Sequence, residues 1–177
     1  PDMINKEFPI VLEKINHDFK NIEISLSKYL ERNELIWDKV IDPLNEINEV
    51  LRWSWGVISH LNAVNNSNEL RDIYSKFLPE IISLSNKFGQ SKIIYNALVR
   101  LKETNNLDRI KNRILEKEIL EMGHSGISLK KDDQKKFNIN SEKLGKLSTN
   151  FSNNVLDATN SWFLILDNKT QIDGLPE

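Results

Sequence analysis

Apolar residues return every three or four positions along six stretches of the chain, a pattern that is typical of amphipathic helices. The first stretch runs from Phe8 to Leu30, and the second opens near Trp37. Within the second stretch, Pro43 removes a backbone donor and restricts the residue before it. We therefore expect the helix that opens near Trp37 to break or restart at this proline.

The part of the chain that follows this proline carries an unusually broad set of apolar positions. They are Leu44, Ile47, Val50, Leu51, Trp53, Trp55, Val57, Ile58, Leu61 and Val64. On a helical projection they cover roughly 200° of the surface, about twice the width of the stripe that a helix packed on one side needs. We therefore expect a central helix with partners on two sides, in which Trp53 and Leu61 are buried.

Four further helices are predicted, over about residues 68–88, 93–101, 107–123 and 130–159. The first of them contains Pro79, which should kink it, and Gly89 suits the left-handed position after its end. The last would be about 45 Å long and needs neighbours along its whole length. The pattern therefore predicts an all-α, multi-helix bundle with a long C-terminal helix.

The apolar period changes after this long helix. Trp162–Leu166 is a continuous apolar run that Asp167 and Asn168 follow, which predicts a short strand-like segment and a turn near the end of the chain. No obvious second strand is available to pair with it. The run should either fold back on the bundle or mediate self-association of the chain, and we favour self-association.

Composition and charge exclude several classes of partner. The length of 177 residues fits one domain, and the net charge is -2 with the two signs interspersed. Such a surface has no electrostatic footprint for nucleic acid. No apolar run is long enough to span a bilayer, and the first residues lack the pattern of a signal peptide. We predict no nucleic-acid partner, no membrane partner and a cytoplasmic location.

The chain offers little catalytic chemistry. It has no cysteine, and its three histidines, His17, His60 and His124, are not spaced as an H-E-x-x-H zinc helix requires. His60 lies at the edge of the apolar arc, where a core-edge histidine is a better interpretation than a ligand. The segment Gly123–Gly126 resembles part of a nucleophile elbow, but a helix precedes it and Ile127 replaces the last glycine. The sequence therefore predicts no catalytic, cofactor-binding or metal-binding residue in this chain.

One segment goes further than pattern. Phe151–Thr159 reads Phe-Ser-Asn-Asn-Val-Leu-Asp-Ala-Thr, and Trp162 follows it. Other characteristic pieces occur along the chain: Trp37 with Pro43 and Leu44, Ser59–Val64, Glu69–Arg71, Leu78 with Pro79, Gly89, and Gly174–Glu177. Together they resemble the oligopeptidase A and thimet oligopeptidase family of zinc metallopeptidases.

The resemblance implies that residues 1–177 are the N-terminal helical domain of a larger zinc oligopeptidase whose catalytic part is absent from this chain. The full-length protein would hold zinc and degrade short peptides, and this domain would form one wall of the substrate channel. The zinc ligands and the general base of that family would lie far beyond Glu177. No cofactor and no catalytic residue can be carried onto the present sequence.

Two alternatives remain open. The chain could be a stand-alone helical protein-interaction module without enzymatic activity. It could also be an enzyme with an unrecognised site, which would need clustered acidic residues or histidines that the periodicity does not place together. A reading frame that continues past Glu177 into an H-E-x-x-H motif would favour the oligopeptidase.

We predict that the isolated chain hydrolyses no peptide and binds zinc no better than a surface histidine does. Three scattered histidines and no cysteine cannot supply the three protein ligands of a catalytic zinc site. Metal analysis of the purified chain and an assay with a short fluorogenic peptide check this. One tightly held zinc per chain, or zinc-dependent cleavage, would contradict the prediction.

Overall fold

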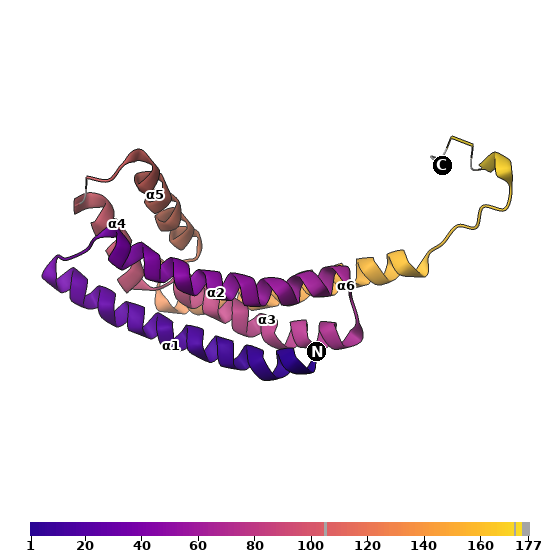
Figure 1. The fold of residues 1–177 in the computed structure, drawn as a ribbon, viewed down its shortest axis with the longest axis horizontal. Helices are drawn as coiled ribbons and strands as arrows, with labels where there is room; N and C mark the ends of the chain where they lie inside the picture. Colours follow the sequence, from indigo (N-terminus) through magenta and orange to yellow (C-terminus); the bar gives the residue numbers. More distant parts are fainter. Residues whose placement is uncertain (105, 172, 175–177) are drawn as a thin grey trace.

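The computed structural model describes residues 1–104, 106–171 and 173–174, and nearly all of them are helical (Figure 1). The α-helices are α1 (Asp2–Arg32), α2 (Trp37–Val64), α3 (Asn68–Gly89), α4 (Lys92–Thr104), α5 (Arg109–His124) and α6 (Lys131–Ser161), and a 3-10 turn, η1 (Lys169–Gln171), follows them. Each helix that the periodicity predicts is present at its expected place. The all-α bundle with a long C-terminal helix is confirmed.

Short polar residues and a left-handed residue set several of the helix ends. The Ser67 hydroxyl accepts a hydrogen bond from the Leu70 backbone N–H at 3.3 Å, and the Asp108 carboxylate accepts from the backbone N–H groups of Ile110 and Lys111. Each therefore satisfies N–H groups that the first helical turn leaves unpaired. At the C-terminal end of α1, Asn33 takes the left-handed conformation that ends the helix.

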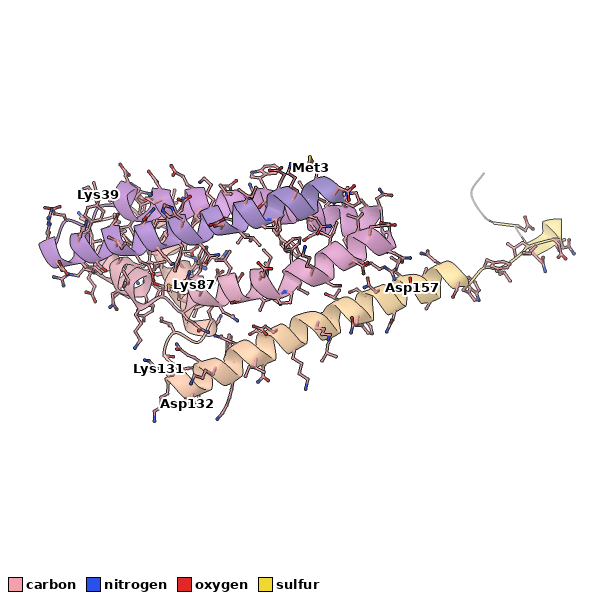
Figure 2. All side chains as sticks on the ribbon, turned by 90° about the horizontal axis from the view of Figure 1, so that it is seen from below. Met3, Lys39, Lys87, Lys131, Asp132 and Asp157 are labelled. Atoms are coloured by element: carbon pink, nitrogen blue, oxygen red, sulfur yellow. The ribbon has the colours of Figure 1, made fainter. Side chains whose placement is uncertain are left out.

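The long helices lie side by side in an elongated bundle. α1 packs along α2, α3 packs against α2, and α4 joins α1 to α5. α6 packs against α3 at the edge of the bundle, and its last turns extend past the other helices into the tail (Figures 1 and 2). None of the helices in the described ranges has the length and apolar content needed to cross a membrane.

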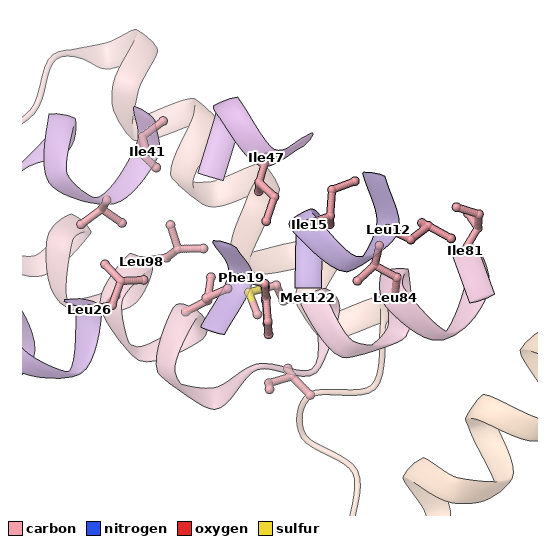
Figure 3. Close-up of a cluster of buried hydrophobic side chains, with 14 of the residues drawn as sticks. Leu12, Ile15, Phe19, Leu26, Ile41, Ile47, Ile81, Leu84, Leu98 and Met122 are labelled. Atoms are coloured by element: carbon pink, nitrogen blue, oxygen red, sulfur yellow. The ribbon is translucent and has the colours of Figure 1, made fainter. Parts of the chain in front are cut away.

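Side chains from α1 to α5 meet in one apolar core (Figure 3). The largest fully buried side chains are Phe19, Phe77, Ile15, Leu26, Leu101, Leu115 and Val40. The Trp55 ring of α2 lies between Phe8 of α1 and Tyr74 of α3, with ring centroids 5.8 and 4.8 Å away. Stacking at such distances adds to the energy of burial and fixes the three long helices together. α6 contributes no buried residue.

Pro43 does not break α2, so that prediction is wrong. The helix continues through the proline from Trp37 to Val64. Val40 and Ile41 before the proline, and Ile47 after it, are all buried in the core. Burial of each such side chain stabilises the fold by about 1.5–3 kcal/mol, which offsets the roughly 3 kcal/mol that a proline inside a helix costs.

The expectation that α2 is covered on two sides is also wrong in part. Trp53 is 65% exposed, Val57 and Val64 are exposed as well, and Leu61 is only half-buried. The buried face of α2 is the narrower set that contacts α1 and α3, including Ile47 and Ile58. A broad apolar arc in the sequence does not by itself guarantee a neighbour for each of its sides.

The predictions for Gly89 and for Trp162–Leu166 are wrong. Gly89 is the last helical residue of α3 and has no positive φ; a side chain there would place its Cβ 2.5 Å from Cβ of Ser125, so close approach explains the glycine. Trp162–Leu166 forms no strand, because no second strand exists in the described residues to pair with it. Of the resembling end segment Gly174–Glu177, residues 175–177 lie outside the described part.

The corrected picture of α2 predicts opposite outcomes for two adjacent residues. Ile58 is 2% exposed, so Ile58→Ala should lower the free energy of unfolding by about 2–5 kcal/mol. Val57 is 52% exposed, so Val57→Ala should change it by no more than about 0.5 kcal/mol. Urea unfolding of the two variants measures both values. Equal effects would mean that α2 does not pack as the structure shows.

Candidate functional site

α6 turns a mostly polar face inward and leaves a row of apolar side chains exposed. Its half-buried residues are mostly small or polar, namely Gln134, Asn138, Ser141, Gly145, Thr149 and Asn153, with Phe137 and Leu156 among them. Four exposed apolar side chains along one side of the helix, which we call the α6 strip, are Leu144, Leu147, Phe151 and Val155, and they are between 49% and 71% exposed. A helix that packs on a core normally buries its apolar stripe. In this chain that stripe is left uncovered.

Gly145 makes this arrangement possible. A Cβ at this position would collide with the Cδ1 atom of Ile82 on α3, and it would lie 3.7 Å from Cδ2 of Leu78 on the same helix. The missing side chain lets the two helices approach closely along a face that has little apolar area. α3 therefore holds α6 by shape and not by a large buried surface.

Polar contacts hold α6 near both ends. At its start, Nε2 of Gln90 donates to Oδ1 of Asn138 at 2.7 Å and to the Ser125 carbonyl at 2.9 Å. Near the C-terminal end of α6, the Arg71 guanidinium donates two hydrogen bonds to Asp157, at 2.9 and 2.6 Å. Asp157 is labelled in Figure 2. These hydrogen bonds, helped by the nearby positive charge, lower the pKa of the Asp157 carboxyl. A third bond, from Nε of Arg71 to Asn66, orients the guanidinium.

A groove of about 590 Å³ lies between the C-terminal half of α2, α3 and α6. Its residues are Ser59, Asn62, Ala63, Asn66, Tyr74, Ser148, Thr149, Phe151, Ser152, Asn153, Val155, Leu156 and Thr159. None of them carries a charge, although 28% of the chain does. The α6 wall includes Phe151 and Val155 of the strip, and the α2 wall is small and amide-rich. Such a surface suits a protein or peptide segment better than an ion.

The segments that carry the family resemblance converge on this groove. Ser59–Val64 forms the α2 wall, and Phe151–Thr159 forms much of the α6 wall. Glu69–Arg71 supplies Arg71, whose partner Asp157 belongs to the second segment. Sequence reasoning did not single out this ion pair, and its only signal was that both residues lie inside the resembling pieces. The fold thus joins parts that are 86 positions apart.

The three histidines do not form a site. They lie exposed on three different helices, α1, α2 and α5, and His17 contacts Asp18 and Asn21 of its own helix. His60 is more exposed than a core-edge position would be. Among the described residues, no three histidine, cysteine or acidic side chains lie close enough together to share a metal ion.

A second cavity of about 180 Å³ lies between α2, α4 and α5. Burial at this cavity raises the pKa of the Glu118 carboxyl, and the charge of Glu121 adds to the effect. The polar groups beside them are Asn45, Asn48 and Ser125. The described residues that line the cavity include no lysine, arginine or histidine to pair with these two carboxyls. The cavity is therefore a weak candidate for acid–base chemistry.

Comparison with known proteins agrees with the sequence resemblance. Residues 8–135 match the family model described as the neurolysin/thimet oligopeptidase N-terminal domain. A probable cytosolic oligopeptidase A of Arabidopsis thaliana is 38% identical over 160 residues, which is 89% of this chain and 23% of that protein. Oligopeptidase A of Haemophilus influenzae is 35% identical over 94% of this chain and 24% of its own length. Oligopeptidase A of Escherichia coli is 30% identical over 96% and 25%, respectively.

The extent of these matches sets two boundaries. The chain spans about a quarter of the length of the curated relatives that it matches. The match to the family model ends at residue 135, within the first turns of α6, whereas the matches to whole relatives cover nearly all of this chain. Most of α6 therefore lies outside the match to the family model.

The contact at Gly145 predicts a specific effect of a side chain. Gly145→Val should force Ile82 to move and α6 to shift away from α3, and should destabilise their packing by about 1–3 kcal/mol, because the added atoms overfill the contact. Amide hydrogen exchange should become faster along α6 in this variant. The matched control is Gly56→Val, since Gly56 lies inside α2 with nothing within 4 Å of a Cβ. Equal exchange rates of α6 in the two variants would show that the close contact does not hold this helix.

Proposed function

This chain belongs to the neurolysin/thimet oligopeptidase N-terminal domain family, and we propose that it is the non-catalytic helical domain of an oligopeptidase A-like zinc metalloendopeptidase. The match over residues 8–135, together with relatives named oligopeptidase A, carries the proposal. Residues 1–177 would be the N-terminal domain, and the peptide-cleaving part would lie in the remainder of a longer protein. The location we propose for that protein is the cytoplasm.

Zinc would be held by that remainder and not by this domain. The described residues do not fit a zinc site, because their three histidines lie on separate helices and no acidic cluster accompanies them. A catalytic zinc needs three protein ligands that converge on one point. We therefore assign no step of the reaction to a residue of this chain.

The role that fits this domain is architectural. Its aromatic core locks α1, α2 and α3 together over helices of 31, 28 and 22 residues, which makes a long and stiff wall. A rigid wall beside the catalytic part would narrow the channel to the zinc, admit short peptides and exclude folded proteins. Such a wall needs stable packing but no reactive group of its own.

A stand-alone interaction module is the second candidate. The observation in its favour is the uncovered apolar surface of α6, since contiguous exposed apolar patches mark interaction sites. The two candidate functions predict different activities. An interaction module would bind a separate protein and cleave nothing, whereas the N-terminal domain of an oligopeptidase would belong to a protein that cleaves peptides.

The full-length product of the gene tests the proposal. It should contain zinc, cleave a short fluorogenic peptide, lose this activity with a chelator and regain it with added zinc. It should leave a folded protein substrate intact, because the channel admits only short chains. Residues 1–177 alone are the matched control and should be inactive. A full-length protein that cleaves no peptide contradicts the peptidase, and one that digests folded proteins contradicts the role as a channel wall.

A further inference from the structure

We infer that the α6 strip and the apolar tail Trp162–Leu166 form the surface on which the polypeptide following this domain packs in the larger peptidase. This inference rests on the proposed function, because it takes that polypeptide to be the catalytic part. The α6 strip comprises Leu144, Leu147, Phe151 and Val155, as defined above. The tail continues from the end of α6 and extends away from the bundle (Figure 1), and its apolar side chains are exposed like those of the strip.

The exposed apolar area is too concentrated to be ordinary surface. Single exposed apolar side chains are common and need no explanation. The strip instead repeats at three- or four-residue spacing along one side of α6, and Trp162–Leu166 adds five consecutive exposed apolar residues. A contiguous apolar surface of this kind usually marks an interface.

The charge distribution indicates the chemistry of the occupant. The groove beside the strip is lined by uncharged residues, with Phe151 and Val155 on one wall and Asn62 and Ser59 on the other. Depletion of charge at the centre, with apolar and amide groups, is typical of the core of a protein–protein interface. An occupant with an uncharged, largely apolar face fits it, and one that depends on ion pairs does not.

The extent of the relatives favours the following polypeptide over a second copy of this chain. The match to the family's N-terminal domain model ends at residue 135, and the strip, which begins at Leu144, lies outside that match. The relatives are about four times as long as the part that this chain matches. In such enzymes a large body of protein beyond the matched part is therefore available to cover α6 and the tail.

The other exposed apolar stripe, on α2, is a poorer candidate. Trp53 donates from Nε1 to the Glu49 carboxylate at 2.9 Å, and the Arg52 guanidinium lies 4.9 Å from its ring. These contacts give the indole a hydrogen-bond partner and a stabilising cation–π interaction within its own helix, although the ring stays exposed. In the described residues no ring or cation covers Phe151 or Trp162 in this way. The α2 stripe therefore provides the control.

Hydrogen exchange on residues 1–177 and on the full-length protein tests the surface. In the isolated chain, α6 should exchange faster than α2 because it buries no residue. In the full-length protein, the amides of residues 144–166 should exchange at least about ten-fold more slowly than in the isolated chain. Those of residues 50–57 should exchange at unchanged rates. Protection of the α2 stripe without protection of α6 would overturn the inference.

Two matched double variants separate this surface from a merely structural one. Phe151→Ser with Val155→Ser changes side chains that are 71% and 49% exposed, and Trp53→Ser with Val57→Ser changes side chains that are 65% and 52% exposed. Neither pair should shift the thermal midpoint of the isolated chain by much. In the full-length protein, only the α6 pair should lower the midpoint and open the tail to protease. Equal behaviour of the two pairs there would contradict the inference.

The remaining outcomes keep the two proposals apart. A full-length protein that cleaves peptides with zinc while α6 exchanges as in the isolated chain would overturn the docking surface alone. A protein with protected α6 but no peptide cleavage would overturn the peptidase and support the surface. Sedimentation of residues 1–177 as a dimer that the α6 pair dissociates would identify a second copy as the occupant and overturn the inference.

Discussion

The close contact of α6 with α3 decides which surface this domain presents. Gly145 lets α6 approach Ile82 and Leu78, and the face that it turns inward has little apolar area to bury. The stripe of apolar side chains must then point elsewhere. A side chain at position 145 would require Ile82 to move or α6 to shift. The exposed strip is the other side of this close approach.

The helical architecture could be predicted from the sequence because each helix carries its own periodicity. Ser67 and Asp108, which cap the starts of α3 and α5 in the structure, are local features of the same kind. The failures share another origin. Trp53 belongs to an apolar arc but is exposed, and Trp162–Leu166 has a strand-like composition but no partner. The spacing of apolar residues in the sequence shows which face of a helix is apolar. Whether that face is buried depends on which neighbours the fold places beside it.

The groove could not be predicted from local pattern. Its walls come from segments about 90 positions apart, and Arg71 with Asp157 is an ordinary pair of charges until the fold brings them within 2.6 Å. The resemblance to a peptidase family named both segments but gave no reason for them to meet. Similarly, the role of Gly89 as a point of close approach to Ser125 requires knowledge of where the loop after α5 returns. Long-range placement is the information that a single sequence hides.

Different interactions hold the α1–α5 bundle together and attach α6 to it. α1 to α5 bury large apolar and aromatic side chains, so their packing is independent of any partner and suits a rigid wall. α6 is fixed by Gly145, by the Gln90–Asn138 hydrogen bond and by the Arg71–Asp157 ion pair, none of which consumes its apolar side chains. Exposed ion pairs of this kind contribute little stability, but their geometry is specific. Polar contacts thus orient α6, and its exposed apolar side chains remain free to pack against another surface.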